Sequence, residues 1–293
     1  VLVFVDKNVN TGITVSLTGS YLSGADISNY TLSLAGAPTT TANITVKELT
    51  VTGITASNKV YDGNTTATLD TDSAVLVGVV GVEDITLDKS AAVGTFADKN
   101  VATGITVQVS GLALGGTGIK TNYSLTQPTT TADITAKELT IGGSFTANNK
   151  VYDGNTNATI NDNSLTLVTV VGSEDVSLTP VLVFADKNVN TGITVSLTGS
   201  YLSGADIGNY TLSLAGAPTT TADITAKELT IGGSFTANNK VYDGSTSATI
   251  INNSLTLITV VGSEDVSLTP VLVFADKNKA NNITVSLTGS YLS

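Results

Sequence analysis

The stretch Val60-Tyr-Asp-Gly63 decides how this chain is organised, because it returns as Val151–Gly154 and again as Val241–Gly244. The period is about 90 residues, which is enough for a small domain with its own core and too long for one unit of a solenoid. A second stretch, Lys-Glu-Leu-Thr, recurs with the same period and begins at Lys47, Lys137 and Lys227. The sequence therefore predicts a string of similar small domains.

The period divides the chain into four parts. We expect complete domains at residues 47–136 and 137–226, the C-terminal part of a domain at 1–46 and the N-terminal part of another at 227–293. Such an arrangement is what an excerpt from a longer array would show. Residues 1–50 and 181–230 differ only at positions 5, 28, 43 and 46. Near-identical copies favour length, spacing or multivalency over one specialised catalytic site.

Composition narrows the classes of function. The chain has 24 acidic and 13 basic residues and a net charge of −11, which argues against nucleic-acid binding. Because His and Cys are absent, the usual acid–base, nucleophilic and disulfide chemistry is not available, and we expect neither an enzyme nor a cofactor. No apolar run approaches the ~20 residues of a membrane helix. The many Thr, Ser, Asn and Gly residues favour an extracellular location.

The apolar residues follow the period of β-strands. Ile13-Thr-Val-Ser-Leu17 and Ile105-Thr-Val-Gln-Val109 alternate apolar and polar residues, and 41% of the chain is hydrophobic. Within 47–136 we expect strands near 48–57, 64–70, 74–80, 84–88, 93–97, 104–110, 121–126 and 130–136, and no helix. Seven or eight short strands in ~90 residues are typical of an immunoglobulin-like β-sandwich. The predicted fold class is all-β, with tandem sandwiches of this kind.

The joins between domains have no Gly/Ser or Pro linker. In Asp133-Ile-Thr-Ala-Lys-Glu-Leu-Thr-Ile141 the alternation shifts by one residue at Lys137-Glu138. A shift of one residue moves side chains to the opposite face, so the last strand of one domain should lead directly into the first strand of the next. We therefore expect domains joined end to end in a rod.

The Tyr-Asp-Gly motif is interpreted as a structural corner. Asp-Gly favours a turn because Gly accepts positive φ, and Tyr can bury its ring while its hydroxyl reaches a backbone partner. The motif residues are Tyr61, Asp62, Gly63, Tyr152, Asp153, Gly154, Tyr242, Asp243 and Gly244.

The ordered motifs resemble a known family. Val-Tyr-Asp-Gly-Asn-Thr, Gly-x-Glu-Asp, Ala-Asp-Lys-Asn, Asn-Tyr-Ser/Thr-Leu and Thr-Ala-Asp-Ile-Thr are similar to the YDG repeats of large filamentous-haemagglutinin-like, biofilm-associated bacterial adhesins. The resemblance covers the whole chain. It implies a secreted protein of the bacterial cell surface or biofilm matrix, in which these domains form the stalk.

Acidic residues in loops are candidate calcium ligands, since calcium binds carboxylate and carbonyl oxygens. The candidates are Glu83, Asp84, Asp98, Glu174, Asp175 and Asp186. Solvated turns are the simpler interpretation, because no Asp-x-Asp-x-Asp-Gly loop is present. Lys59, Lys150 and Lys240 could in principle form intramolecular isopeptide bonds if each had a buried partner.

Three functions are compatible with these features of the sequence. The leading expectation is a non-catalytic stalk or fibre segment whose partners are the neighbouring repeats of the same chain. The first alternative is a self-assembling extracellular filament subunit, in which other copies of the chain are the partners and the partial domains at the two ends complete one another. The second alternative is a module that binds surface glycans.

Overall fold

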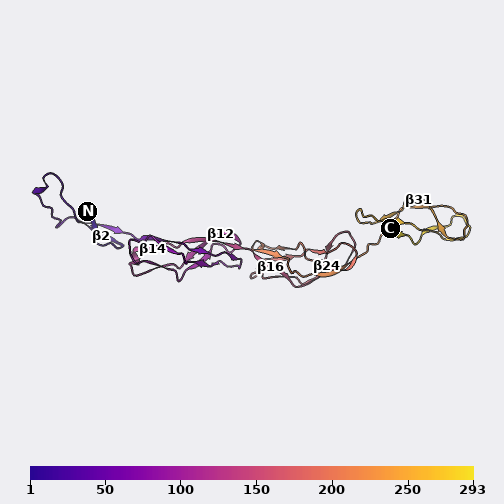
Figure 1. Cartoon of the computed structure of the whole chain (residues 1–293), viewed down its shortest axis with the longest axis horizontal. Helices are drawn as coiled ribbons and strands as arrows, with labels where there is room; N and C mark the ends of the chain where they lie inside the picture. Colours follow the sequence, from indigo (N-terminus) through magenta and orange to yellow (C-terminus); the bar gives the residue numbers. More distant parts are fainter. The chain divides into compact units, whose positions relative to one another are not determined.

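The computed structural model describes all 293 residues, and the regular secondary structure of the chain consists almost entirely of short strands (Figure 1). The helical turns are three 3₁₀ segments, Ile27–Asn29, Lys120–Asn122 and Ile207–Asn209, and none of them could cross a bilayer. The all-β prediction is confirmed. The chain forms two compact units. Unit 1 consists of Val1–Glu138, Val170–Val176 and Gly204–Thr211, and unit 2 consists of Leu139–Thr169, Ser177–Ser203 and Leu212–Ser293.

The main sheet of unit 1 has five strands in the order β6-β15-β12-β11-β7. These strands are β6 (Lys59–Val60), β15 (Thr129–Thr135), β12 (Ala102–Ser110), β11 (Val93–Phe96) and β7 (Thr66–Ala67). Along β12 the side chains of Ile105, Val107 and Val109 are buried and their neighbours are exposed, as the alternating sequence predicts. β15 is antiparallel to β12 and parallel to β6.

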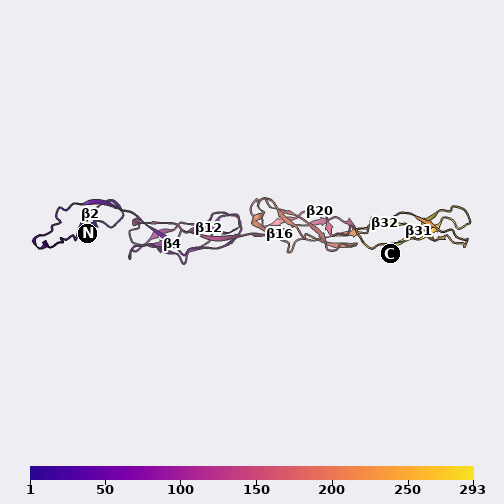
Figure 2. The same cartoon turned by 90° about the horizontal axis from the view of Figure 1, so that it is seen from above.

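Smaller sheets complete the first full repeat. β4 (Lys47–Thr52) lies between β14 (Tyr123–Leu125) and β9 (Val75–Val77), and Figure 2 shows β4 and β12 in the same body. β10 (Thr86–Asp88) pairs with β13 (Ala113–Gly115), and β5 (Thr55–Ala56) pairs with β8 (Leu69–Asp70). The strand expected at 48–57 is therefore two strands, because Gly53 has φ +83° and ends the first. Together the sheets enclose the core in a barrel-like arrangement.

The core of this repeat consists of apolar side chains from its strands and from the loops that join them. Val51, Ile54, Val109 and Leu112 form one buried cluster, and Leu49, Ile85 and Tyr123 form another. The residues before this repeat add a three-stranded sheet made of β1 (Leu2–Phe4), β2 (Asn10–Leu17) and β3 (Thr40–Ile44).

A β-bulge fixes where the last strand pairs. The register between β12 and β15 shifts between Ala102 and Ile105, and Gly104 has φ +63°. The backbone N–H of Gly104 donates to Asp133 Oδ1 at 2.7 Å, so the Asp of the Thr-Ala-Asp-Ile-Thr motif holds the bulge.

The second repeat reproduces this sheet within unit 2, in the order β18-β27-β24-β23-β19. Its strands are β18 (Lys150–Val151), β27 (Thr220–Thr225), β24 (Asn190–Ser196), β23 (Leu182–Phe184) and β19 (Asn157–Ala158). Pairs are also formed by β16 (Lys137–Gly142) with β21 (Thr166–Val168), β17 (Phe145–Ala147) with β20 (Ile160–Asn163), and β22 (Ser177–Thr179) with β25 (Tyr201–Ser203). β26 (Tyr210–Ser213) is a neighbour of β16. Phe145, Phe184, Val195 and Ile224 lie in the buried core.

The remaining residues of unit 2 form the third repeat. Its sheets are β28 (Thr230–Gly232) with β32 (Thr256–Ile258), β29 (Phe235–Ala237) with β31 (Ile250–Asn253), β33 (Leu268–Thr269) with β36 (Tyr291–Leu292), and β30-β34-β35 (Ser247–Ala248, Leu272–Phe274, Val285–Leu287). The counterparts of β18 and β27 are not among these strands, so the sheet that has five strands in the other repeats has three here.

The joins between repeats are short. Ala136 alone separates β15 from β16, Thr45 and Val46 separate β3 from β4, and residues 226–229 separate β27 from β28.

Candidate interface between consecutive repeats

The Val-Tyr-Asp-Gly segment folds into a turn, and the side chain of the preceding lysine binds oxygen atoms of that turn. Lys59 Nζ lies 2.7 Å from Asp62 Oδ1 and 2.7 Å from the carbonyl oxygen of Asn64, and it sits 5.4 Å above the centre of the Phe96 ring. Gly63 has φ +80°, which only Gly adopts without strain. The same lysine contacts recur at Lys150 and Lys240. The hydrogen bond from Lys240 lowers the pKa of Asp243 to about 2.

Tyr61, which precedes the Asp-Gly turn, contacts the next repeat. Its side chain is only 1% exposed, and its hydroxyl donates to Glu174 of the second repeat rather than to a backbone group of its own domain. The expected backbone partner for this hydroxyl was therefore wrong. The ring of Tyr61 meets the ring of Tyr210 edge-on, with centroids 5.5 Å apart and an interplanar angle of 80°. All of these residues belong to unit 1.

Glu174 is the acceptor at the centre of this contact. Its carboxylate accepts hydrogen bonds from the hydroxyls of Tyr61 and Tyr210, and Lys99 Nζ lies 3.4 Å from Oε1. Burial opposes ionisation of Glu174, but the hydrogen bonds from Tyr210, Tyr61 and Lys99 outweigh it, so the pKa of the carboxyl is lowered. Burial and then the bond to Glu174 raise the pKa of Tyr61. The arrangement is a charge-assisted hydrogen-bond cluster shielded by two rings.

Gly63 allows the two repeats to approach closely. A Cβ atom at this position would lie 2.7 Å from Val171 Cγ1, which is inside van der Waals contact. Glycine is therefore required at this position for two reasons: the backbone has a positive φ, and Val171 occupies the space that a Cβ atom would need.

Paired asparagines form the second part of the contact. Asp98 Oδ1 accepts from the backbone N–H of Asn100 at 3.0 Å and from its side-chain amide at 2.9 Å, which orients the amide. Asn209 Nδ2 then donates to Asn100 Oδ1 at 3.1 Å, and Asn209 Oδ1 accepts from the N–H of Val101 at 3.0 Å. Asn209 is 6% exposed. Its amide is satisfied on both sides, as a buried polar group requires.

The asparagine pair also occurs at the start of the chain. Asn122 Nδ2 donates to Asn8 Oδ1 at 3.0 Å, and the N–H of Val9 donates to Asn122 Oδ1 at 2.9 Å. Next to it, Tyr123 donates to Glu83 at 2.7 Å. Residues 1–46 and the first full repeat therefore meet through the same Asp-Lys-Asn and Asn-Tyr residues that connect the first and second full repeats.

The second and third repeats repeat the tyrosine contact inside unit 2. The hydroxyl of Tyr152 donates to Glu264, and a Cβ atom at Gly154 would lie 2.7 Å from Val261 Cγ1. The equivalent tyrosine of the third repeat, Tyr242, is 62% exposed. The motif thus changes from buried to exposed according to whether the loop of another repeat covers it.

The six calcium candidates accept hydrogen bonds from the protein. Glu83 and Glu174 bind tyrosine hydroxyls, Asp98 and Asp186 bind the asparagine two residues later, Asp84 binds Thr117, and Asp175 binds the N–H of Ala205. No group of three or more acidic side chains is positioned to hold a metal ion. Calcium binding stays a prediction.

The structure shows no buried side chain positioned to form an isopeptide bond with Lys59 or Lys150. Lys59 and Lys150 form ion pairs with Asp62 and Asp153, each 46% exposed. The lysines also donate to the side-chain oxygens of Asn64 and Asn155, which are exposed as well. The lysines hold the turn in place through these ion pairs.

The chain matches the family model of the YDG domain over residues 45–132, 135–222 and 225–293. It therefore belongs to the YDG domain family and contains three tandem copies, two of 88 residues and a third that is matched over 69. The chain matches no curated protein and no solved structure.

Sequence reasoning missed that the separate motifs meet. Taken one at a time, Tyr61 is a corner residue, Glu174 a possible calcium ligand, and Asn209-Tyr210 part of a strand. The available signal was their common period, because a residue that recurs once per repeat can serve the contact between repeats as well as the fold.

Proposed function

We propose that this chain is a non-catalytic stalk or fibre segment of a secreted bacterial adhesin or biofilm matrix protein. The observation that supports this most directly is the contact of Tyr61 with Glu174 and Tyr210, because the residues for which the motif is recognised connect one repeat to the next. A protein whose recurring residues are used for contacts between repeats is suited to length and resistance to bending.

We also place each repeat in the immunoglobulin-like class and the array in the form of a rod. The support is the mainly antiparallel five-stranded sheet, in which a short early strand pairs in parallel with the last strand (β6 with β15), and joins of one to four residues. The assignment to the bacterial surface is supported by the resemblance of the ordered motifs to adhesin repeats.

Small-angle X-ray scattering of the chain tests the stalk directly. We expect the profile of a stiff elongated particle, and we expect Tyr61→Ala to add bending while Tyr30→Ala does not, since Tyr30 is 71% exposed. A compact particle, or a flexible profile for the unaltered chain, would reject the proposal.

A further inference from the structure

The Asp-Gly bond of the motif is a chemically reactive point of the chain. Asp-Gly occurs at residues 62–63, 153–154 and 243–244 and nowhere else, and Asn-Gly does not occur. An aspartate followed by glycine is prone to isomerisation, because glycine has no side chain to hinder attack by its own amide nitrogen on the preceding carboxyl group. Each repeat therefore contains one reactive bond, and the bond lies in the Tyr-Asp-Gly turn.

The reaction joins the amide nitrogen of Gly63 to the side-chain carboxyl carbon of Asp62. The hydroxyl of the carboxyl group leaves as water with the amide proton, and a cyclic succinimide forms. A second water opens this ring, and opening at the main-chain carbonyl carbon leaves isoaspartate, whose backbone runs through the side chain and is one carbon longer. The reaction requires a carboxyl group that is neutral and free to turn toward the glycine nitrogen.

The lysine three residues earlier opposes both requirements. Lys59 Nζ donates to Asp62 Oδ1 at 2.7 Å, and the N–H of Asn64 donates to the same oxygen at 3.1 Å. Burial raises the pKa of Asp62, but the hydrogen bonds from Lys59 and Asn64 outweigh burial, and the pKa is lowered. The carboxylate is thus kept ionised and held in one position.

Lys59 is itself fixed by the residues around it. Its Nζ also donates to the carbonyl oxygens of Asn64 at 2.7 Å and Thr66 at 3.1 Å, and it lies 5.4 Å from the centre of the Phe96 ring. The side chain is only 17% exposed. These contacts hold a flexible side chain against the carboxylate of the turn.

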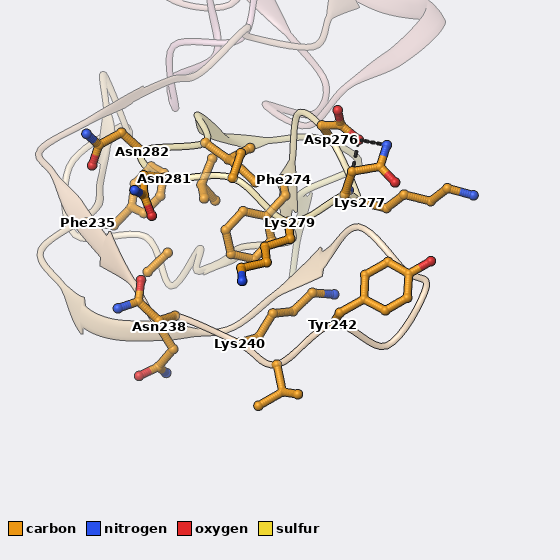
Figure 3. Close-up of a pocket in the computed structure, with 17 residues that line it drawn as sticks. Phe235, Asn238, Lys240, Tyr242, Phe274, Asp276, Lys277, Lys279, Asn281 and Asn282 are labelled. Carbon is orange, nitrogen blue, oxygen red and sulfur yellow. Dashed lines mark hydrogen bonds between the residues drawn. The ribbon is translucent and has the colours of Figure 1, made fainter.

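The same contact accompanies the other two Asp-Gly bonds. Lys150 Nζ lies 2.7 Å from Asp153 Oδ1, and Lys240 Nζ lies 2.9 Å from Asp243 Oδ1. Figure 3 shows Lys240 extended along the turn that carries Tyr242. A lysine therefore binds the aspartate of every Asp-Gly bond in the chain.

We propose that the Asp-Gly bond of each repeat is a site of spontaneous isomerisation and that the lysine three residues before the aspartate suppresses the reaction. Isomerisation at Asp62 would lengthen the main chain between Tyr61 and Gly63. These two residues contact Glu174 and Val171 of the second repeat, so the lengthened chain would disturb the contact between repeats. The lysine thereby protects that contact against chemical ageing.

Isoaspartate mapping of the full chain tests the proposal. Lys59→Met keeps a long apolar side chain against Phe96 and removes the donor to Asp62. Losing a hydrogen bond to a charged group frees the carboxyl about tenfold more often, so we expect isoaspartate at Asp62 to accumulate about tenfold faster at neutral pH. Asp153 in the same chain keeps its lysine and should keep its rate. Peptide mapping by mass spectrometry, with enzymatic methylation of isoaspartate, measures both sites.

Two matched variants separate the lysine from the fold in general. Lys150→Met should reverse the pattern, with faster isomerisation in the second repeat alone. Val107→Ala leaves a cavity in the core of the first repeat and keeps both lysines, so it should leave both rates unchanged. An unchanged rate at Asp62 in Lys59→Met, equal acceleration at both sites, or the same acceleration in Val107→Ala would overturn the proposal.

The pH dependence of the unaltered chain gives a test that needs no variant. Only the neutral acid loses its hydroxyl as water, so isomerisation slows as the pH rises through the pKa of the carboxyl. The charged side chain in contact with Asp62 is Lys59. The rate at Asp62 should therefore fall at a lower pH than the rate in a free peptide of residues 57–68, and a fall at the same pH would contradict the proposal. None of these measurements depends on stiffness, so the stalk proposal is tested separately.

Discussion

Removing one hydroxyl from the contact between repeats should loosen two loops without unfolding the domain that supplies it. In Tyr61→Phe the buried ring keeps its packing against Tyr210, and only the hydrogen bond to Glu174 is lost. A hydrogen bond to a charged group contributes ~1.5–3 kcal/mol, and Glu174 keeps two other donors, so we expect a loss of ~1.5 kcal/mol. That loss corresponds to about tenfold in an opening equilibrium.

Hydrogen exchange followed by mass spectrometry measures this opening segment by segment. We expect amides in 170–176 and 204–211 to exchange about tenfold faster in Tyr61→Phe, while those of β12 keep their rate. Tyr30→Phe is the matched control, because Tyr30 is the equivalent of Tyr210 in residues 1–46 and is 71% exposed. Unchanged exchange in both loops, or an equal effect in Tyr30→Phe, would refute the assignment of this contact.

Acid should act on the same contact through Glu174. Its pKa is lowered in the folded protein, so its stabilising contribution is complete above the ordinary glutamate pKa and is lost as the pH falls through the lowered value. We therefore expect exchange in the two loops to accelerate only below the ordinary range of glutamate. In Glu174→Gln this acid step should disappear.

Three other changes probe the remaining parts of the contact. Gly63→Ala combines positive φ with a Cβ placed 2.7 Å from a valine methyl group, and should destabilise by more than the ~1–2 kcal/mol of backbone strain expected for Gly36→Ala, where φ is +75° and the space is open; urea denaturation of both variants measures the difference. Asn209→Ala leaves a backbone N–H without its acceptor and should cost ~1–3 kcal/mol by the same assay, whereas the exposed equivalent Asn29→Ala should be neutral. In an alkaline titration followed by ultraviolet absorbance, Tyr61 should ionise after the exposed tyrosines, because its raised pKa gives stability that is complete below pH 10.0 and is lost as the pH rises through the folded value.

The strands could be predicted because their signal is local. Alternation in Ile105–Val109 specifies which face is buried, and the structure buries Ile105, Val107 and Val109. β13 was missed, since its three residues carry no alternation to detect. The pairing of β6 could not be predicted either, because its partner in β15 lies 75 residues away, which a local pattern does not contain.

The contact between repeats was hidden for a different reason. Tyr61 and Glu174 are separated by 113 residues, and each is a plausible turn or surface residue when taken alone. Only the fold brings the turn of one repeat to the loop of the next. The period of the motifs indicated that these residues belong together without indicating how they meet.

The repeat therefore encodes two requirements in one motif, which explains why the motif is Tyr-Asp-Gly. Asp62 and Gly63 are sufficient for the turn, because the carboxylate binds Lys59 and the glycine takes φ +80°. Neither function needs an aromatic hydroxyl. The hydroxyl of Tyr61 is explained by Glu174 and its ring by Tyr210, and Val171 gives a second reason why residue 63 has no Cβ. Substituting Tyr61 should thus weaken the contact between repeats while leaving the turn intact, whereas substituting Asp62 should do the reverse.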